Sequence, residues 1–522
     1  MNLKIFTPRG GVHPDSHKTE SSETPIRHVP MPPRLIIPLI QGSQGSARTI
    51  VTVGDKVLKG QCIGEAEGAD GTSIHAPTSG TVTEIGRYPM AHPSGLSSQS
   101  IVIEPDGENH WITYEPLDPT TANRDELILR IQASGIVGMG GAVFPSHLKA
   151  RSKINTLVIN GAECEPWMTG DDRLMRERAA NIVSGAAVLA HLTGAQQTLI
   201  GIEDNKPEAI AATRTAVDDM EPVARECLGT GKMTVIVVPT RYPTGERKQL
   251  IHVLTGIEIP PSDRVTKFGI QCFNVATAHA VCRALLHGEP MVSRIVTVTG
   301  NVKRPGNYET PLGMPIADLL AFCGVKPNTT HVLMGGPMMG FTLPNLDAPV
   351  TKGCNCLIAA SKELFPPPPS EQPCIRCGEC VDACPVNLQP FELYWASRAK
   401  NFDGAKYHRL FDCMECGCCA YVCPAHIPLV DYFRYASSEI RARDEEQKAA
   451  DQARMRFEFR SSRLEREKAE KSARLAARAT ETRTKSAADA ALIAAAAERV
   501  NEQAQIEPSL QDNAAPLYDQ QT

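Results

Sequence analysis

The sequence lacks any uninterrupted apolar run of about 18 residues, the length that a membrane-spanning helix requires. Aromatic residues make up only 5% of the 522 residues, and the formal net charge is −5, so no excess of basic residues is present. Nucleic-acid binding would need clustered positive charge, and nucleic acid is therefore not expected as a partner. Residues Met1 to Gly10 contain no apolar segment after Lys4, so no signal peptide is predicted. We expect a soluble, cytoplasmic chain that reaches a membrane only through a partner.

Glycine is absent after Gly417, and proline is absent between Pro428 and Pro508. Residues 436–500 are instead rich in Ala, Glu, Arg and Lys, which are good helix formers with polar surfaces. We predict a tail over residues 436–522 that is helical or partly disordered. A solvated helix is favoured over a helix that docks on a partner.

The rest of the chain changes character several times, which predicts a multidomain protein with α/β and β parts. Residues 1–31 are polar and rich in Pro, Ser and His, and are expected to form an irregular arm. Residues 32–118 are expected to form a β domain. Two alternating segments within it, Val51 to Val57 and Ser73 to Val82, contain turn residues at Gly54, Pro77 and Gly80.

Residues 119–290 have the pattern of an α/β domain. Short apolar runs at Thr156–Asn160, Gln197–Ile202 and Thr234–Pro239 are typical of buried parallel strands, and Ala179 to Leu192 is an Ala-rich helix. Residues 291–350 return to β, starting with Arg294 to Gly300. A linker is predicted over residues 351–370, because Pro366 to Pro369 favour a stiff extended chain.

Cysteines are concentrated in the following module, residues 371–435. Nine of the 17 cysteines lie between Cys374 and Cys423, which in a reducing compartment indicates metal ligation rather than disulfides. They form two complete C-x2-C-x2-C-x3-C-P motifs. The first motif runs from Cys374 to Pro385 and the second from Cys413 to Pro424. This spacing predicts two [4Fe–4S] clusters of the bacterial ferredoxin kind.

The fourth cysteine of each such motif ligates the other cluster in two-cluster ferredoxins. We therefore predict crossed ligation, which brings the two clusters close together for electron exchange. The first cluster is assigned to Cys374, Cys377, Cys380 and Cys423. The second is assigned to Cys413, Cys416, Cys419 and Cys384.

Other interpretations of the cysteines are less favoured. Structural zinc usually pairs one C-x2–4-C with a distant second pair, unlike these two complete motifs. A radical-generating cluster would need C-x3-C-x2-C, which is not found in a convincing context. Cys418 has no ligand position and is expected to be a packed thiol. Between the motifs, Phe391 to Phe411 is helix-like, and Trp395 is expected to pack around the clusters.

Clusters move single electrons, so a second site must load them. A glycine-rich loop begins at Gly135 and includes Gly138, Gly140 and Gly141, where backbone can approach a phosphate or a flat ring. It is not G-x-G-x-x-G, so a Rossmann fingerprint is absent. Lys149 follows at a spacing from which it could reach a phosphate.

A second segment strengthens the nucleotide hypothesis. Asn160 lies at the carboxyl end of a predicted strand, where α/β proteins bind ligands, and Glu163 and Glu165 follow it. Two carboxylates beside an amide could hold ribityl hydroxyls or a nicotinamide. The alternative is that both glutamates are exposed loop charges.

These motifs resemble a known family. Gly138 to Pro145 with Lys149, then Asn160 to Pro166, look like the FMN- and NADH-binding subunit of respiratory complex I. Tyr242 to Leu250 and Asn274 to Ala278 continue the match. The resemblance places Glu246 and Asn274 where that family contacts flavin or nicotinamide.

The order of the domains resembles the C subunit of the Rnf/Rsx ion-translocating electron transport complex, over roughly residues 1–435. That layout implies an N-terminal arm containing Gly10 to Pro14 and a biotinyl/lipoyl-like barrel-sandwich domain over 32–118. An FMN/NADH-binding α/β domain covers 119–290. A soluble-ligand-binding β-grasp module over 291–350, with Gly335 to Gly340, precedes the ferredoxin module.

The resemblance implies a function. NADH would bind over FMN, and electrons would pass through the clusters to membrane partner subunits that move H⁺ or Na⁺. The chain would be a peripheral protein on the cytoplasmic face of the bacterial inner membrane. The flavin phosphate and ring would be held by Gly138, Gly140, Gly141 and Lys149. Ribityl and nicotinamide groups would be oriented by Asn160, Glu163, Glu165 and Glu246, with no catalytic side-chain acid or base.

The sequence also departs from the complex I pattern. Ala162 replaces an aspartate of that family, so one flavin or nicotinamide contact differs. The β domain has no lysine to be lipoylated or biotinylated near Gly68 to Asp70, which indicates a structural or docking role. Two other functions stay open: a flavin-free electron-transfer adaptor, which Ala162 supports, and a scaffold whose redox chemistry is incidental.

Overall fold

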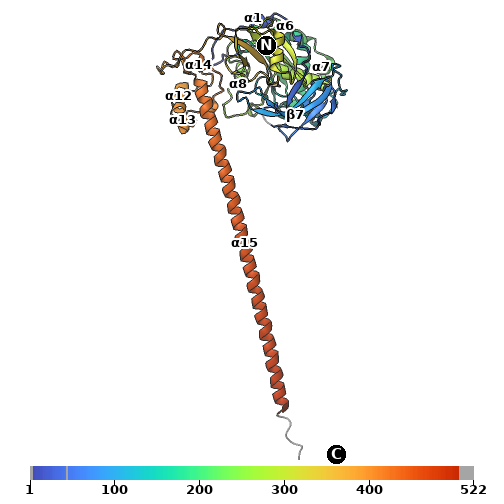
Figure 1. The fold of residues 1–522 in the computed structure, drawn as a ribbon, viewed down its shortest axis with the longest axis vertical. Helices are drawn as coiled ribbons and strands as arrows, with labels where there is room; N and C mark the ends of the chain where they lie inside the picture. Colours follow the sequence, from blue (N-terminus) through green and yellow to red (C-terminus); the bar gives the residue numbers. More distant parts are fainter. Residues whose placement is uncertain (1–3, 43–44, 505–522) are drawn as a thin grey trace, which may run out of the picture. The chain divides into compact units, whose positions relative to one another are not determined.

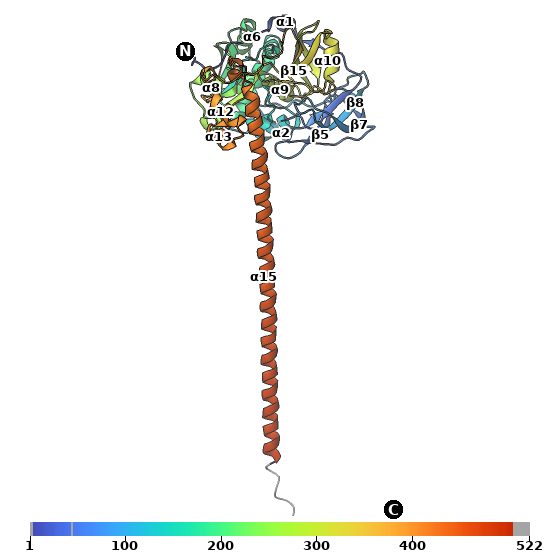
Figure 2. The same ribbon diagram turned by 60° about the vertical axis from the view of Figure 1, so that its left-hand side comes forward.

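The computed structural model describes residues 4–42 and 45–504 (Figure 1). The chain divides into two compact units, Met1–Ser437 and Ser438–Thr522. Within the first unit, the strands of the N-terminal β domain and the helices of the cysteine module lie at opposite sides, as the labels β7 and α12 show in Figures 1 and 2. The α/β domain and every predicted cofactor residue lie within the first unit.

The N-terminal arm is more regular than predicted. It contains α1 (Thr19–Ser22) and β1 (Arg27–His28). β1 pairs in parallel with β14 (Gly306–Pro311) of the β-grasp module, with Arg27 opposite Tyr308. The prediction of an irregular arm over residues 1–31 is wrong at these two elements, because the arm finds hydrogen-bonding partners on a distant sheet edge. Residues 1–3 of that range lie outside the described residues.

The N-terminal β domain consists of two small antiparallel sheets that share one core. Their strand orders are β2-β8-β7-β4 and β3-β5-β6. The predicted turn at Gly54 is present with φ +97°, directly before β4. The strands are β2 (Leu35–Pro38), β3 (Ala47–Thr49), β4 (Lys56–Val57), β5 (Cys62–Ala66), β6 (Ile74–His75), β7 (Gly80–Pro89) and β8 (Ser97–Pro105).

A four-stranded parallel sheet of order β11-β10-β9-β12 forms the centre of the α/β domain. Its strands are β9 (Thr156–Gly161), β10 (Gln197–Glu203), β11 (Lys232–Val238) and β12 (Ile270–Asn274). The three apolar runs singled out in the sequence correspond to β9, β10 and β11 with end shifts of one or two residues. Helices cover the sheet, so its strands have few exposed side chains.

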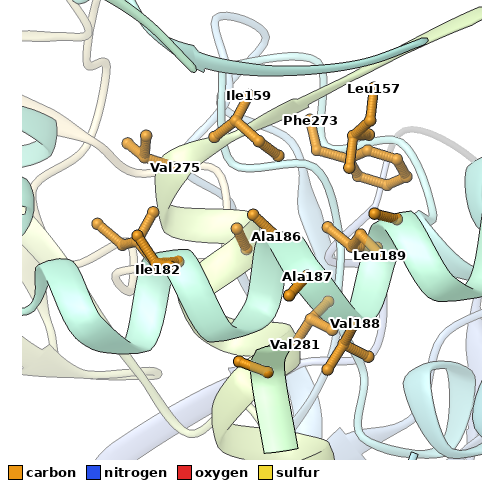
Figure 3. Close-up of a cluster of buried hydrophobic side chains, with 14 of the residues drawn as sticks. Leu157, Ile159, Ile182, Ala186, Ala187, Val188, Leu189, Phe273, Val275 and Val281 are labelled. Carbon is orange, nitrogen blue, oxygen red and sulfur yellow. The ribbon is translucent and has the colours of Figure 1, made fainter. Parts of the chain in front are cut away.

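The helices of this domain are α2 (Arg124–Ala133), α3 (Ser146–Ala150), α4 (Gly170–Glu177), α5 (Ala179–Thr193), α6 (Pro207–Asp218), α7 (Pro222–Leu228), α8 (Arg247–Thr255), η1 (Val265–Phe268) and α9 (Val275–Leu286). Figure 3 shows Ala186 and Ala187 of α5 packed between Val281 of α9 and the side chains of β9 and β12. A Cβ on Gly185 would lie 1.9 Å from the Ala278 carbonyl oxygen, so the two helices touch there. The small residues of α5 allow this close approach of α9, which explains why the Ala-rich segment forms the central helix.

The β-grasp module has a six-stranded sheet of order β1-β14-β13-β17-β15-β16. Besides β14 it comprises β13 (Ser293–Gly300), α10 (Ile316–Cys323), β15 (Thr329–Met334), β16 (Phe341–Thr342) and β17 (Cys356–Ser361). β17 is fully buried and lies between β13 and β15, so the predicted linker over 351–370 is wrong in its first half. The apolar run Cys356 to Ala360 carried this signal, and residues 362–378 run without helix or strand.

The cysteine module repeats one local geometry. Gly378 (φ +88°) precedes α11 (Glu379–Asp382), and Gly417 (φ +79°) precedes α14 (Cys418–Tyr421), so the turn after the second cysteine of each motif uses a left-handed glycine. Between the motifs lie α12 (Pro390–Arg398), α13 (Phe402–Tyr407) and η2 (Leu410–Asp412). Trp395 is 38% exposed and its ring centroid lies 5.2 Å from that of Tyr394, so it packs on the module's surface.

The last helix is α15 (Leu429–Ala504), which begins before the predicted tail boundary at residue 436. From Asp451 onward its side chains are almost all exposed, and same-face ion pairs such as Arg463–Glu467 at 3.4 Å lie along it. The tail is thus helical through residue 504, and residues 505–522 lie outside the described residues. Over the described chain, no helix is both long and apolar enough to cross a membrane.

Candidate functional site

A cleft of about 1780 Å³ opens at the carboxyl ends of β9 and β12 in the α/β domain. Parallel α/β sheets bind ligands at this edge because the loops there converge. All the residues that the sequence assigns to flavin or NADH line this cleft, although they lie as far apart in the chain as Gly138 and Asn274. They are Gly138, Gly140, Gly141, Lys149, Asn160, Glu163, Glu165, Glu246 and Asn274.

The glycine-rich loop presents open backbone to the cleft. The Gly138 amide donates a 2.7 Å hydrogen bond to the Phe144 carbonyl, which closes the loop as a tight hairpin. Gly141 has φ +101°, and a Cβ built there would meet no atom of the described residues within 4 Å. The Met139 amide donates to Thr277 Oγ1 at 3.0 Å and so ties the loop to α9. The loop therefore leaves room for a flat or phosphorylated ligand to approach its main chain.

Lys149 lies on the cleft wall, and no carboxylate of the described residues pairs with its ammonium. Nζ donates to the Cys272 carbonyl and lies 4.5 Å from the centre of the Phe273 ring. The pKa of Lys149 is lowered to about 8, mainly by removal from water; the Cys272 thiol opposes this shift and the positive charge of Arg247 contributes to it. An anionic group in the cleft would satisfy this ammonium, which fits the phosphate of FMN.

Glu163 is buried, with 7% of its surface exposed, so the alternative of an exposed loop charge is wrong for this residue. Its carboxylate accepts from the Asp171 amide at 2.9 Å and the Asp172 amide at 3.3 Å, at the start of α4. Burial raises the pKa of Glu163 to about 7. The structure thus uses Glu163 to hold α4 against the cleft, beside Asp171.

Glu165 links two domains. Its carboxylate accepts from the Met338 amide at 2.8 Å and the Met339 amide at 3.3 Å in the glycine-rich turn of the β-grasp module. A Cβ on Gly336 would lie 2.0 Å from the Glu165 carboxylate, which explains the glycine at that position. Burial raises the pKa of Glu165, and the two amides oppose that shift.

The three remaining predicted polar residues order the backbone around the cleft. Asn160 donates to the Gly245 carbonyl at 2.8 Å. Glu246 caps α8 by accepting from the Lys248 amide at 2.7 Å. Asn274 caps α9 and donates to Asp171 Oδ2 at 2.6 Å. Ala162, the position that departs from the complex I pattern, also lines the cleft.

Sequence reasoning missed two basic residues of the β-grasp module and one of the arm. Arg294 lines the cleft and donates to the Met139 carbonyl at 2.8 Å. Lys352 donates to the Gly135 carbonyl at 2.7 Å, and burial lowers its pKa to about 7. Lys18 donates to the Glu163 carbonyl at 2.6 Å. A charged residue at the head of an apolar strand was the available signal for Arg294.

The second predicted cysteine set surrounds one cavity in the ferredoxin-like module. The cavity is lined by Cys384 from the first motif together with Cys413, Cys416 and Cys419 from the second. The pKa of Cys413 is raised to about 12, mainly by burial, with a contribution from the neighbouring charges of Cys416 and Cys384. The tertiary structure thus brings Cys384 to the opposite motif, as crossed ligation requires. Cys418 is fully buried beside them and lines the same cavity.

The first predicted set lies nearer the surface. Burial raises the pKa of the Cys380 thiol to about 11, and the charges of Cys377, Cys423 and Cys374 add to this shift. Cys423 of the second motif is therefore close to the first motif. Cys377 is exposed, and Cys374 and Cys423 are partly exposed.

No three His, Cys, Asp or Glu side chains within residues 4–42 and 45–504 converge tightly enough to ligate a single metal ion. A [4Fe–4S] cube binds each thiolate to a different iron atom, so its ligands stand farther apart than those of one zinc ion. Five thiols line the cavity, and the four at ligand positions fit such a cube in their chemistry.

The cleft and the second cysteine set are in contact. Tyr242, a cleft residue, donates a 2.6 Å hydrogen bond from its hydroxyl to the Cys416 carbonyl. Gln249 of α8 donates to the Pro385 carbonyl at 3.2 Å. Met414, between two of the cysteines, itself lines the cleft. A cofactor in the cleft would therefore lie on the side of the second set.

Comparison with known families finds four domain matches. The RnfC Barrel sandwich hybrid domain matches residues 6–108, and the Nuo51 FMN-binding domain matches residues 131–283. The SLBB domain matches residues 295–342, and the 4Fe-4S dicluster domain matches residues 373–427. These matches confirm the predicted domain classes and the two predicted cofactors, FMN and iron–sulfur clusters.

A curated relative, the C subunit of an ion-translocating oxidoreductase complex from Pectobacterium carotovorum subsp. carotovorum (strain PC1), is 46% identical over 497 residues. The match covers 94% of this chain, which spans 65% of the relative's length. Two solved structures of NAD+-reducing [NiFe]-hydrogenase, H2-reduced and air-oxidized, are also similar. Each has 19% identity and a TM-score of 0.45 and covers 62% of this chain, and 62% and 63% of the respective hydrogenase chains are matched.

Proposed function

The chain belongs to the family of the C subunits of ion-translocating oxidoreductase complexes, and from this premise we propose that it is the peripheral subunit through which such a complex exchanges electrons with NADH. Electrons pass between NADH, FMN and two [4Fe–4S] clusters, and then to or from membrane partner subunits. The proposed location is the cytoplasmic face of the bacterial inner membrane. The observation that carries the proposal is that the cleft formed by the FMN-type motifs directly contacts the second cysteine set.

The residues of the cleft fit FMN. Bound FMN supplies the conversion of a two-electron hydride transfer into single-electron transfers. Lys149 offers an ammonium that no carboxylate of the described residues pairs with, and the open backbone at Gly140 and Gly141 leaves space beside it. The Lys149 side chain would hold the phosphate, and the loop would hold the ring. The side chains of this chain would bind and orient these groups, and none of them is assigned the role of a general acid or base.

Glu163 and Glu165 hold backbone segments of the protein in place, in addition to any contact with the ligand. Each carboxylate accepts two backbone amides, from α4 and from the β-grasp turn respectively. These bonds fix the cleft wall before a ligand arrives, and such preorganisation places the nicotinamide without a later ordering cost. Asn160, Glu246 and Asn274 likewise hold the loops that orient ribityl and nicotinamide groups.

The two cysteine sets have different positions along the route. Cys384, Cys413, Cys416 and Cys419 surround the cavity on the side of the cleft, so this set takes the first position after the flavin. Cys374, Cys377, Cys380 and Cys423 include the exposed Cys377 and take the outer position, facing a partner. Crossed ligation keeps the two clusters close, as rapid exchange between them requires.

Anaerobic purification followed by flavin, iron and sulfide analysis tests the proposal. We expect about one FMN per chain and roughly eight iron atoms, the content of two [4Fe–4S] clusters. Addition of NADH should bleach the flavin absorbance and then reduce the clusters. Iron and sulfide without flavin would reject this function in favour of the flavin-free adaptor, to which the alanine at position 162 points.

The scaffold alternative makes a different prediction. If redox chemistry were incidental, complexes that carry Cys377→Ala or Cys416→Ala would keep full ion-translocating activity. We expect both substitutions to abolish electron transfer through the complex, while assembly of the complex is retained. Loss of activity with normal assembly would reject scaffolding.

A further inference from the structure

The glycine-rich loop is held at its start and at its centre by side chains from another domain. At its start, Lys352 Nζ donates to the Gly135 carbonyl at 2.7 Å and to the Ser73 carbonyl at 3.1 Å. At its centre, Arg294 donates to the Met139 carbonyl at 2.8 Å. Both basic residues lie outside residues 131–283, the segment that matches the FMN-binding domain. The conformation of the loop therefore depends on the β-grasp module.

The Arg294 side chain also contacts the backbone of Lys352. Arg294 donates through its other terminal nitrogen to the backbone carbonyl of Lys352. The resulting chain of hydrogen bonds runs from the loop through β13 to the residue that holds the start of the loop. Lys352 further reaches Ser73 of the barrel domain, so three domains meet at this point. A shift of one side chain would move the start and the centre of the loop together.

Burial of a basic side chain has a desolvation cost that an opposite charge nearby would offset. Lys352 is fully buried and Arg294 is 7% exposed. Within the described residues, neither Arg294 nor Lys352 forms an ion pair with a carboxylate. The N–H groups of both side chains donate to backbone carbonyls instead. A neutral donor could satisfy a carbonyl at a lower desolvation cost. Asp171 lines the same cleft and its charge favours the charged form of Arg294, but within the described residues the two form no ion pair, so the guanidinium keeps its capacity for an anionic ligand.

A second observation points the same way. Arg294 lines the cleft, and its buried Nε has no hydrogen-bond partner among the residues that the structure describes. Buried polar atoms in proteins are nearly always paired, so an unpaired guanidinium nitrogen beside a ligand cleft needs a partner. Lys149 faces the same cleft and spends its ammonium on a backbone carbonyl. Two basic groups around one cleft fit a phosphate monoester.

We propose that Arg294 and Lys352 are positioning residues of the flavin site, which set the glycine-rich loop and let Arg294 supply positive charge to the flavin phosphate. The β-grasp module is then a working part of flavin binding rather than a spacer between flavodomain and clusters. This inference rests on the proposed function, because it concerns the same cleft. It adds a requirement that the FMN-binding segment alone does not contain.

Flavin titration of the full chain tests the inference. The flavin is removed, and FMN or riboflavin is added while quenching of flavin fluorescence is followed. Riboflavin lacks the phosphate, so the comparison isolates the anionic contact. We expect Arg294→Met to weaken FMN binding at least tenfold and to weaken riboflavin binding much less. Lys352→Met should weaken both flavins by similar factors, because it acts only through the loop.

A matched control is available in Arg124. This half-buried arginine also donates to backbone carbonyls, those of Leu192, Ala150 and Arg151, but it does not line the cleft. We expect Arg124→Met to change FMN affinity less than twofold even where it lowers the unfolding temperature. Thermal unfolding of each flavin-free variant separates lost stability from lost affinity. Equal losses of FMN affinity in the Arg294 and Arg124 variants would reduce Arg294 to a structural role.

A conservative variant, Arg294→Lys, provides a second test in case Arg294→Met does not fold. Arg294→Lys keeps the charge but cannot reach the Met139 and Lys352 carbonyls at once, so it should retain FMN better than Arg294→Met. If Arg294→Met fails to fold, the ratio of FMN to riboflavin affinity in Arg294→Lys and Lys352→Met decides the question. Unchanged FMN affinity in folded Arg294 and Lys352 variants overturns the inference. Absence of FMN binding by the unaltered chain would instead overturn the proposed function.

Discussion

The hydroxyl of Tyr242 donates a 2.6 Å hydrogen bond to the backbone carbonyl of Cys416, and both residues are buried. Tyr242 lies on the cleft wall, while Cys416 belongs to the cysteine set nearest to it. The arm reinforces this contact, since Val12 and Tyr242 exchange two backbone hydrogen bonds and Gly11 donates to the Ala383 carbonyl. One buried side chain, that of Tyr242, therefore joins the cleft to the second cysteine set.

We predict that Tyr242→Phe slows electron transfer from flavin to clusters several-fold while FMN content stays unchanged. The variant leaves the buried Cys416 carbonyl without its donor, which costs about 1 kcal/mol and alters the surroundings of one ligand. Stopped-flow absorbance should show normal flavin reduction by NADH and delayed cluster reduction. The EPR signal and midpoint potential of one cluster should shift.

Tyr308→Phe is the matched control for this variant. Tyr308 is also buried and donates to a backbone carbonyl, that of Arg304, at 2.6 Å, but it lies in the β-grasp module. It should lose similar stability without affecting the EPR signals. Identical cluster spectra and rates in both variants would contradict a specific role for Tyr242.

Crossed ligation predicts different outcomes for two neighbouring buried cysteines. Cys384→Ala should remove one ligand of the cluster built mainly by the second motif, and iron content should fall from roughly eight to roughly four atoms per chain. Cys418→Ala should keep both clusters, because Cys418 has no ligand position. Iron and acid-labile sulfide analysis with EPR measures both. Full iron content in Cys384→Ala would contradict the assignment.

FMN affinity should depend on pH through Lys149. In the flavin-free protein the pKa of Lys149 is lowered to about 8, mainly by burial. The ammonium that holds the phosphate is thus present below pH 8 and is lost as the pH rises through that value. We expect FMN affinity to fall up to about tenfold between pH 7 and 9, one pH unit above the pKa. In Lys149→Met the affinity should be lower and this dependence weaker.

The same shift has the opposite consequence for stability. The lysine of the unfolded chain titrates near 10.4, so between about pH 8 and pH 10 the unfolded chain binds more protons than the folded one. The contribution of Lys149 to the stability of the flavin-free protein therefore rises with pH in this window. Thermal unfolding of flavin-free protein and of Lys149→Met across the window checks the sign. A stability difference that is constant with pH would contradict the assignment of this pKa to Lys149.

Removal of the chain after Ala450 should leave FMN, iron and NADH-dependent cluster reduction unchanged in the isolated protein. From Asp451 to Asn501 nearly all side chains are exposed, and no described residue there lines the cleft or the cysteine cavity. Cofactor analysis of the shortened chain measures this. Loss of either cofactor would show that the tail does more than form a solvated helix.

The sequence predicted local features well. The apolar runs that became β9, β10 and β11 and the Ala-rich segment that became α5 have signals within a single element, because burial on both sides dictates their composition. β17 was missed because its short apolar run stands beside a proline-rich stretch. β1 was missed because its partner strand lies 281 residues away in the chain, with Arg27 opposite Tyr308.

The sequence by itself determined the chemistry of this protein: the two cysteine motifs, the glycine-rich loop with Lys149, and the order of the domains. Their residue types and spacings are local, so each can be recognised without a fold. Only the tertiary structure decided that Tyr242 meets Cys416 and that Arg294 and Lys352 hold the glycine-rich loop. Single polar residues carry no periodic signal, and their partners are chosen by domains that pack after the elements have formed.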